Sequence, residues 1–198
     1  YQDHAYAQRY RAFVAEVAEA EAQRANGRTE LASAVAQSLF KLMAYKDEYE
    51  VARLYTDGRF VEQLKTQFEG DFSLKFNLAP PLFAKKDAKG HLVKAEFGSW
   101  MWSAFKLLAK LKGLRGGAFD VFGYTAERKM ERALIGEYRG MIEGVLHSLD
   151  ASTHATAVEL AALPEQIRGF GHVKEKAVAE YRARKEELLS GKVKKRAA

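Results

Sequence analysis

The chain of 198 residues is 47% hydrophobic and 29% charged, proportions that suit a cored globular domain and exclude a disordered chain or a membrane protein. Its formal net charge is +6 and its pI is about 9.4, so nucleic acid, an anionic cofactor or an acidic protein are candidate partners. The absence of cysteine excludes disulfides, thiolate chemistry and cysteine-held zinc or iron–sulfur clusters within these residues.

We expect that the first residues of the chain are not a signal peptide. Residues 1–4 lack the basic start and apolar middle of a signal peptide, and no apolar run approaches the ~20 residues of a membrane span. We therefore expect no contact with a membrane. The missing initiating methionine indicates a piece of a longer polypeptide, and the lack of cysteine is compatible with the cytoplasmic location that we predict.

The first third of the chain is predicted to be helical. Apolar residues at steps of three and four predict one helix over residues 5–25 and a second over residues 30–45, which continues through residues 41–55. In that continuation, tyrosines can share one face while charged residues occupy the other. A core face of tyrosines is the simplest interpretation, and a ligand site is the alternative. Another short helix is predicted over residues 60–68.

The pattern then changes from a helical to a strand period. Residues 72–78 alternate between apolar and polar, which predicts a half-buried strand that Pro80–Pro81 would end. Residues 92–97 alternate again, after a polar loop tip at residues 85–90. The two runs predict one antiparallel hairpin near residues 72–97.

A strongly apolar helix is predicted over residues 100–111. Apolar side chains cover more than half of its circumference, which is typical of a central, buried helix. Its aromatic residues could instead stack on nucleic-acid bases. The lysines lie on the opposite side from most of the aromatics, which argues against that alternative. Residues 119–124 are predicted to form a packed turn.

The longest predicted helix, residues 125–149, carries a stripe of glycines. Gly136, Gly140 and Gly144 repeat every four residues, although each glycine costs a helix ~1 kcal/mol relative to alanine. The stripe therefore predicts close contact with another helix, either within the domain or across an interface.

Glu143 and His147 have the spacing of two metal ligands on one helix face. A di-iron bundle combines two Glu-x-x-His pairs with two further carboxylates, and this chain contains no Glu-x-x-His. We therefore predict a surface pair and no metal site.

A bend at Gly169 and Gly171 separates a short helix from a long charged one. Arg168, His172 and Lys174 surround this bend with positive or protonatable groups. Free N–H groups at a helix N-terminus favour anions, and Arg168 could grip a phosphate or carboxylate with two hydrogen bonds. The sequence lacks the preceding strand and the Gly-Lys-Ser/Thr end of known phosphate loops. The bend is thus either a structural hinge or an anion- or partner-binding site.

Together these elements predict a mainly α fold, a helical domain of about seven to eight helices with one small antiparallel β-hairpin. Residues 192–198 form a basic tail, for which a frayed terminus is a simpler interpretation than a nucleic-acid-binding arm.

Four stretches together resemble one protein family: residues 41–55, 78–81, 110–128 and 163–174. They are similar to the C-terminal region of the fused bacterial indolepyruvate ferredoxin oxidoreductases, which are thiamine-diphosphate-dependent 2-oxoacid:ferredoxin oxidoreductases. The resemblance implies that residues 1–40 are a lead-in helical segment joining the preceding oxidoreductase domain. It implies that residues 41–191 are a C-terminal helical accessory domain.

The resemblance also implies a reaction for the full-length enzyme. A 2-oxoacid such as indolepyruvate, coenzyme A and oxidised ferredoxin would give acyl-CoA, carbon dioxide and reduced ferredoxin, with thiamine diphosphate and 4Fe–4S iron–sulfur clusters as cofactors. This segment has no Gly-Asp-Gly diphosphate motif and no cysteine. We therefore expect a non-catalytic accessory or assembly domain with no catalytic residue, metal or cofactor of its own.

The expected partners follow from that role. They are the other domains of the same polypeptide, a second copy in a homo-oligomer, and ferredoxin for the full-length enzyme. The alternative is a stand-alone basic helical module that binds nucleic acid or another anionic partner. Affinity for nucleic acid that falls steeply with salt would favour that alternative.

Overall fold

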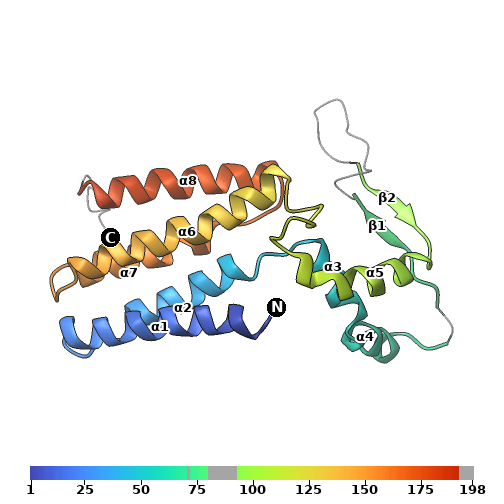
Figure 1. Ribbon diagram of the computed structural model, residues 1–198, viewed down its shortest axis with the longest axis horizontal. Coiled ribbons are helices and arrows are strands. Elements are labelled where there is room, and N and C mark those ends of the chain that lie inside the picture. The colour runs from blue at the N-terminus through green and yellow to red at the C-terminus, as the bar shows by residue number, and fades with distance from the viewer. Residues whose placement is uncertain (71, 80–92, 192–198) are drawn as a thin grey trace. The chain divides into compact units, whose positions relative to one another are not determined.

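The computed structural model describes residues 1–70, 72–79 and 93–191 and is mainly α-helical (Figure 1). In these residues, eight α-helices and one two-stranded antiparallel sheet confirm the predicted fold class. No helix of the described ranges combines the length and the apolar character needed to cross a membrane. The predicted loop tip at residues 85–90, the pair Pro80–Pro81 and the basic tail at residues 192–198 lie outside the described residues.

The chain forms two compact units. The hairpin unit consists of Tyr1–Gln2 and Lys46–Arg128, and the helical unit consists of Asp3–Tyr45 and Lys129–Ala198. This division differs from the predicted one, in which residues 1–40 were a separate lead-in segment. The first two helices instead share one core with the last three, because their apolar faces are completed only by helices from the far end of the chain.

The helical unit is built from five helices that Figure 1 shows as long, adjacent rods. These are α1 (His4–Arg24), α2 (Glu30–Met43), α6 (Ala126–His147, which starts in the hairpin unit), α7 (His154–Ala162) and α8 (His172–Leu189). A 3-10 turn, Leu163–Gln166, follows α7. The core takes side chains from every helix, including Phe13, Val17, Leu31, Val35, Leu134, Ile142, Leu160 and Val178.

The hairpin unit has a smaller core that is rich in aromatic rings. Its elements are α3 (Glu48–Thr56), α4 (Arg59–Gln67), β1 (Phe76–Leu78), β2 (Ala95–Phe97), α5 (Met101–Lys110) and a 3-10 turn, Leu111–Leu114. The strands pair antiparallel with Phe76 opposite Phe97, so the predicted hairpin is confirmed with shorter strands. The rings of Tyr55 and Phe105 stack with centroids 5.2 Å apart, and Phe76 meets Phe105 edge to face at 5.3 Å.

One predicted helix is in fact two. The pattern over residues 41–55 predicted a continuous helix, whereas α2 ends at Met43 and α3 starts at Glu48. The cause is Asp47, whose carboxylate accepts a hydrogen bond from the Glu50 backbone N–H at 2.8 Å and so caps α3. An Asp followed three residues later by a Glu is a helix-start signal, and periodicity alone overlooked it.

The prediction that residues 100–111 form a buried helix is wrong for much of its surface. Only Met101 and Phe105 of α5 are buried, while Trp100 at its N-cap and Leu107 are each 62% exposed. The predicted packed turn over residues 119–124 is also largely open to solvent. Apolar content predicted burial here, but nothing in the part of the hairpin unit that the structure describes covers these side chains.

Two buried tyrosines of the helical unit allow a matched test of buried hydroxyl groups. The Tyr138 hydroxyl donates to the Ala161 carbonyl oxygen at 2.8 Å, whereas the Tyr181 hydroxyl has no hydrogen-bond partner among the described residues. Burial raises the pKa of Tyr181 from 10.0 to about 12, and the Glu137 carboxylate adds to this shift. A buried hydroxyl without a partner costs stability, and one with a partner adds to it.

We therefore expect opposite effects from the two phenylalanine variants. Tyr138→Phe should lower the free energy of unfolding by about 1 kcal/mol, and Tyr181→Phe should leave it unchanged or raise it slightly. Because the unfolded Tyr181 ionises before the folded one, the wild-type protein loses stability as the pH rises from 10.0 to about 12, and Tyr181→Phe removes this loss. Urea unfolding followed by circular dichroism at pH 7 compares the stability of the two variants, and the same measurement at pH 11 gives the loss with pH. Equal losses of stability in the two variants at pH 7 would contradict the assignment of a hydrogen bond to Tyr138 alone.

Candidate functional site

The glycine bend before α8 has the backbone conformation that the sequence predicts. Gly169 has a φ of +90° and Gly171 a φ of +55°, in the region that favours glycine. A Cβ atom on Gly169 would also lie 2.6 Å from Cγ1 of Val173. Glycine is required here by both conformation and space, which supports a structural role for the bend.

The three side chains predicted around the bend are not equally available to an anion. The Lys174 ammonium forms an ion pair with the Glu131 carboxylate of α6, and these side chains are only 16% and 4% exposed. Arg168 and His172 are exposed. Because Glu131 neutralises Lys174 and repels an approaching anion, Lys174 is poorly placed to attract one.

Lys41 of α2 is a further cation at the bend, which the sequence did not predict. Its Nζ atom donates to the Glu165 carbonyl oxygen at 2.7 Å. Burial is the main cause that lowers the pKa of Lys41; the Glu165 carboxylate opposes the shift, and the positive charges of Arg168 and Lys174 add to it. The only sequence signal for Lys41 is its place in the resembling stretch 41–55.

The space beside these charges is small. The cavity lined by Lys41, Glu131, Lys174 and neighbouring apolar side chains has a volume of about 40 Å³. Neither Arg168 nor His172 lines this cavity. The contacts of Lys41 with Glu165 and of Lys174 with Glu131 join α2, α6 and the start of α8, and anion binding at the bend stays a prediction.

The predicted glycine stripe does not touch another helix within the described residues. Gly136, Gly140 and Gly144 are exposed, and a Cβ atom on any of them would meet nothing within 4 Å. The expectation of close helix packing inside the domain is therefore wrong, and contact across an interface stays a prediction. Gly140 and Gly144 border an open groove of about 510 Å³ whose other walls come from α7 and the end of α8.

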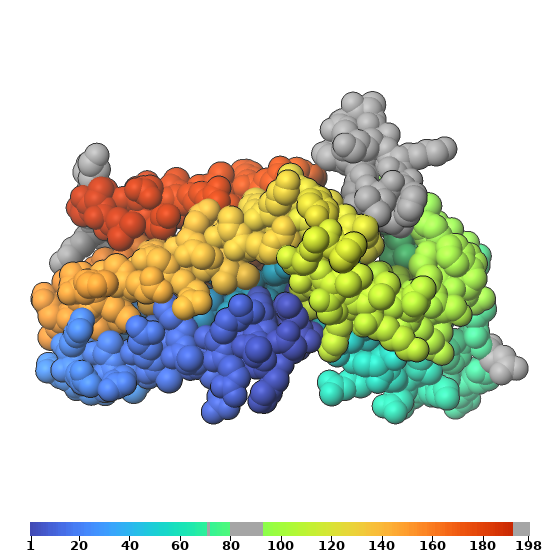
Figure 2. Space-filling view, in the orientation of Figure 1, coloured from blue at the N-terminus to red at the C-terminus, as the bar shows by residue number. Residues whose placement is uncertain are grey.

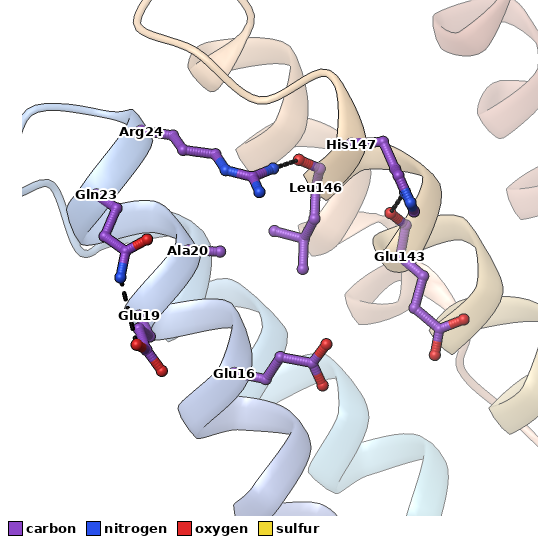
Figure 3. Close-up of a pocket in the computed structure, with 8 residues that line it drawn as sticks. All are labelled: Glu16, Glu19, Ala20, Gln23, Arg24, Glu143, Leu146 and His147. Carbon is purple, nitrogen blue, oxygen red and sulfur yellow. Dashed lines mark hydrogen bonds between the residues drawn. The ribbon is translucent and has the colours of Figure 1, made fainter.

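Glu143 and His147 line a different open groove, of about 320 Å³, between α1 and α6 (Figure 3). Glu16 of α1 points toward Glu143 across this groove, and Glu19 also lines it, a juxtaposition that the sequence did not reveal. His147 Nδ1 lies 2.6 Å from the Glu143 carbonyl oxygen, so the ring is turned toward its own helix. These residues do not bring three ligand atoms within 4.8 Å of one another.

The described residues contain one cluster with the spacing of metal ligands: Glu21, Glu30 and His154. Glu21 is fully buried, and its two carboxylate oxygens accept hydrogen bonds of 2.8 Å from the first backbone N–H groups of α2, those of Leu31 and Ala32. A carboxylate at a helix N-terminus also interacts favourably with the helix dipole. Glu21 thus caps α2 from the neighbouring helix α1.

The histidine of this cluster completes the same cap. His154 Nε2 lies 2.6 Å from Glu21 Oε1, and its Nδ1 lies 3.3 Å from the Arg28 guanidinium. A neutral ring with its proton on Nε2 donates to Glu21 and accepts from Arg28, so we assign that tautomer. The Glu21 oxygens and the His154 ring nitrogens already form hydrogen bonds, and the Arg28 guanidinium would repel a metal ion. The cluster therefore suits helix capping rather than metal binding.

The hairpin unit contains a buried ion pair between Asp47 and Arg115. The two side chains are 4% and 3% exposed, and the guanidinium donates to both carboxylate oxygens, with Nη2 to Oδ1 at 2.8 Å. The guanidinium also lies over the Tyr1 ring at 4.2 Å from its centroid. Asp47 therefore caps α3 and, at the same time, fastens the loop after α5 to that cap.

Two further contacts hold α3, one to the same loop and one to the first turn of α6. The Tyr49 hydroxyl donates to Asp120 Oδ1 at 3.2 Å, and Glu48 lies 3.5 Å from Arg128. Asp120 also accepts hydrogen bonds from two backbone N–H groups of its own loop. We call these three pairs, Asp47–Arg115, Tyr49–Asp120 and Glu48–Arg128, the buried polar network.

The electrostatics of the buried polar network suit structure rather than proton transfer. Burial raises the pKa of Tyr49 to about 12, and Asp120 adds to the shift, so the phenol keeps its proton and donates it to Asp120 in a hydrogen bond. Burial raises the pKa of Glu48 above its usual value, while the positive charge of Arg128 opposes that shift. The ionisable groups are directed at one another within the unit.

The fold and these sites define a mainly α-helical protein of two compact units in which buried polar groups join distant segments of the chain. The chain belongs to the family of unknown function DUF6537, whose sequence profile matches residues 1–187. No curated protein and no solved structure matches the chain.

Proposed function

We propose that this chain is a non-catalytic accessory and assembly domain of a thiamine-diphosphate- and iron–sulfur-dependent oxidoreductase acting on indolepyruvate or a related 2-oxoacid. The supporting observation is that residues 41–55, one of the four stretches resembling that family, contact two of the others. Residues 41–55 and 110–128 build the buried polar network. Residues 41–55 also reach residues 163–174 through Lys41 and Glu165. The resembling residues therefore hold the domain together.

Two features of this chain do not fit the cofactors of such an enzyme. Iron–sulfur clusters are held by thiolates, and the sequence has no cysteine. A diphosphate needs cationic side chains or a metal, and no cationic side chain lines the 510 Å³ groove beside α6. The reaction would take place in other domains of the polypeptide, and this chain would support their assembly.

A direct test is an assay of the full-length gene product that contains this sequence. It should reduce a low-potential electron acceptor only when indolepyruvate, or another 2-oxoacid, and coenzyme A are both present. A fragment of residues 1–198 should show no turnover. If the full-length protein shows no reduction that depends on both substrates, the oxidoreductase assignment is wrong.

The accessory role has its own readout. In the full-length protein, Arg115→Met should shorten the lifetime of activity on heating, or dissociate subunits in sedimentation, while turnover per intact molecule is unchanged. Lys75→Met, which removes an exposed ion pair with Glu96 in the same unit, is the matched control and should change neither. Loss of turnover in a fully assembled Arg115→Met enzyme would instead indicate a role near the chemistry.

A further inference from the structure

Three large side chains on the loop between α5 and α6 are exposed to solvent. Phe119 is 79% exposed, Val121 55% and Tyr124 62%. We call these three residues the apolar loop. In Figure 2, the yellow-green segment after α5 lies open on the face toward the viewer. Exposed apolar side chains that are gathered on one short segment are typical of interaction sites, because burying them against a partner is favourable.

The apolar loop is held in this exposed arrangement by hydrogen bonds. The inward-facing Asp120 accepts from the backbone N–H groups of Gly116 at 2.7 Å and Gly123 at 3.0 Å, and from Tyr49. The Tyr124 hydroxyl donates back to the Ala118 carbonyl oxygen at 2.8 Å. Turning the apolar side chains inward would break these bonds, so the loop is already ordered for binding and loses less entropy when it binds.

The charged side chains that precede the apolar loop in the chain and remain toward solvent have one sign. Between Lys106 and Tyr124 the charged residues are Lys106, Lys110, Lys112, Arg115 and Asp120. The last two are buried in the polar network, so only lysines remain toward solvent. A complementary surface would place carboxylates around an apolar centre.

We propose that the apolar loop docks into an apolar pocket bordered by carboxylates on another folded protein domain. Phe119, Val121 and Tyr124 would fill the pocket, and Lys110 and Lys112 would face its acidic border. Aromatic residues are enriched in the buried centres of protein interfaces, with charged residues at the rim. This inference does not depend on the oxidoreductase assignment.

The same observations disfavour two other occupants. Nucleic-acid sites combine stacking rings with cations that grip phosphate, whereas Arg115 is turned inward to Asp47 and Val121 offers no ring. A symmetric contact with a second copy of this chain would place its lysines near the same lysines, which repel one another.

Photo-crosslinking from position 119 of the full-length gene product, in its native cells, tests the proposal. With the photoreactive amino acid benzoylphenylalanine in place of Phe119, we expect crosslinks to a protein peptide outside residues 1–198 that has acidic neighbours. Lys110→Glu with Lys112→Glu should lower the crosslink yield on the order of tenfold, because charge steering of that size is typical. Added salt should lower the yield as well.

The matched control carries the photoreactive group at Phe68, which is 57% exposed at the end of α4 in the same unit. A yield at position 119 no higher than at position 68 would overturn the proposal. So would a crosslink to nucleic acid, to a second copy of this chain, or to a protein with no dependence on Lys110 and Lys112. Unchanged tryptophan fluorescence of the lysine variant would show that the hairpin unit, which contains Trp100 and Trp102, is still folded.

Discussion

Arg115→Met should lower the free energy of unfolding of the hairpin unit by about 3–5 kcal/mol, because it leaves the Asp47 carboxylate buried without its charge partner. Asp47 and Arg115 are 4% and 3% exposed, so water cannot replace the lost interaction. Urea unfolding followed by tryptophan fluorescence measures this unit selectively, since both tryptophans of the chain belong to it.

Two further variants separate the ion pair from other effects of the substitution. Asp47→Asn removes the charge but keeps a side chain that can cap α3. When combined with Arg115→Met, it should cost less than the sum of the two single changes, because no unpaired charge is then buried. The exposed Lys75–Glu96 pair, whose side chains are 64% and 56% exposed, is the control. If Lys75→Met is as destabilising as Arg115→Met, the role given to burial is wrong.

The second large effect is expected at Glu21, where Glu21→Gln should destabilise the helical unit by about 2–4 kcal/mol. The carboxylate accepts from the N–H groups of Leu31 and Ala32 and from His154. An amide has a single acceptor oxygen, so its NH₂ group must face at least one of these donors. One buried donor would then lose its partner.

Hydrogen exchange gives the local readout for this variant. The amides of Leu31 and Ala32 should exchange faster in Glu21→Gln, and circular dichroism should show a lower urea midpoint. Glu16→Gln, on the exposed side of the same helix, should change stability by no more than about 0.5 kcal/mol. Unchanged protection of the two amides in Glu21→Gln would rule out the cap between α1 and α2.

The break between α2 and α3 shows why sequence periodicity predicts the presence of a helix better than the residues at which it begins and ends. Residues 41–55 have one continuous helical period, and that period was read as one helix. Asp47 and Glu50 form a capping signal that predicts a helix start, whereas the periodicity of the same residues predicts an uninterrupted helix. The cap was strengthened by Arg115, whose contribution is visible only in the folded chain.

The error at α5 has a different origin. Apolar content around a helix indicates how much surface could be buried, not whether this chain supplies the covering partner. Leu107 is 62% exposed although its helix was expected to be central. The glycine stripe on α6 is a similar case. Glycines allow another backbone to approach closely, but Gly140 borders an open groove and no neighbouring backbone.

The sequence by itself determined the mainly helical class, the position of the hairpin, the glycine bend and the lack of cysteine ligands. These features depend on residue type and on spacings of two to four residues, which act locally along the backbone. The tertiary structure alone decided which charges meet. Arg115 is 68 residues from Asp47, and His154 is 133 residues from Glu21. Such pairs form because packing of distant helices excludes water from both groups, and no local pattern encodes that packing.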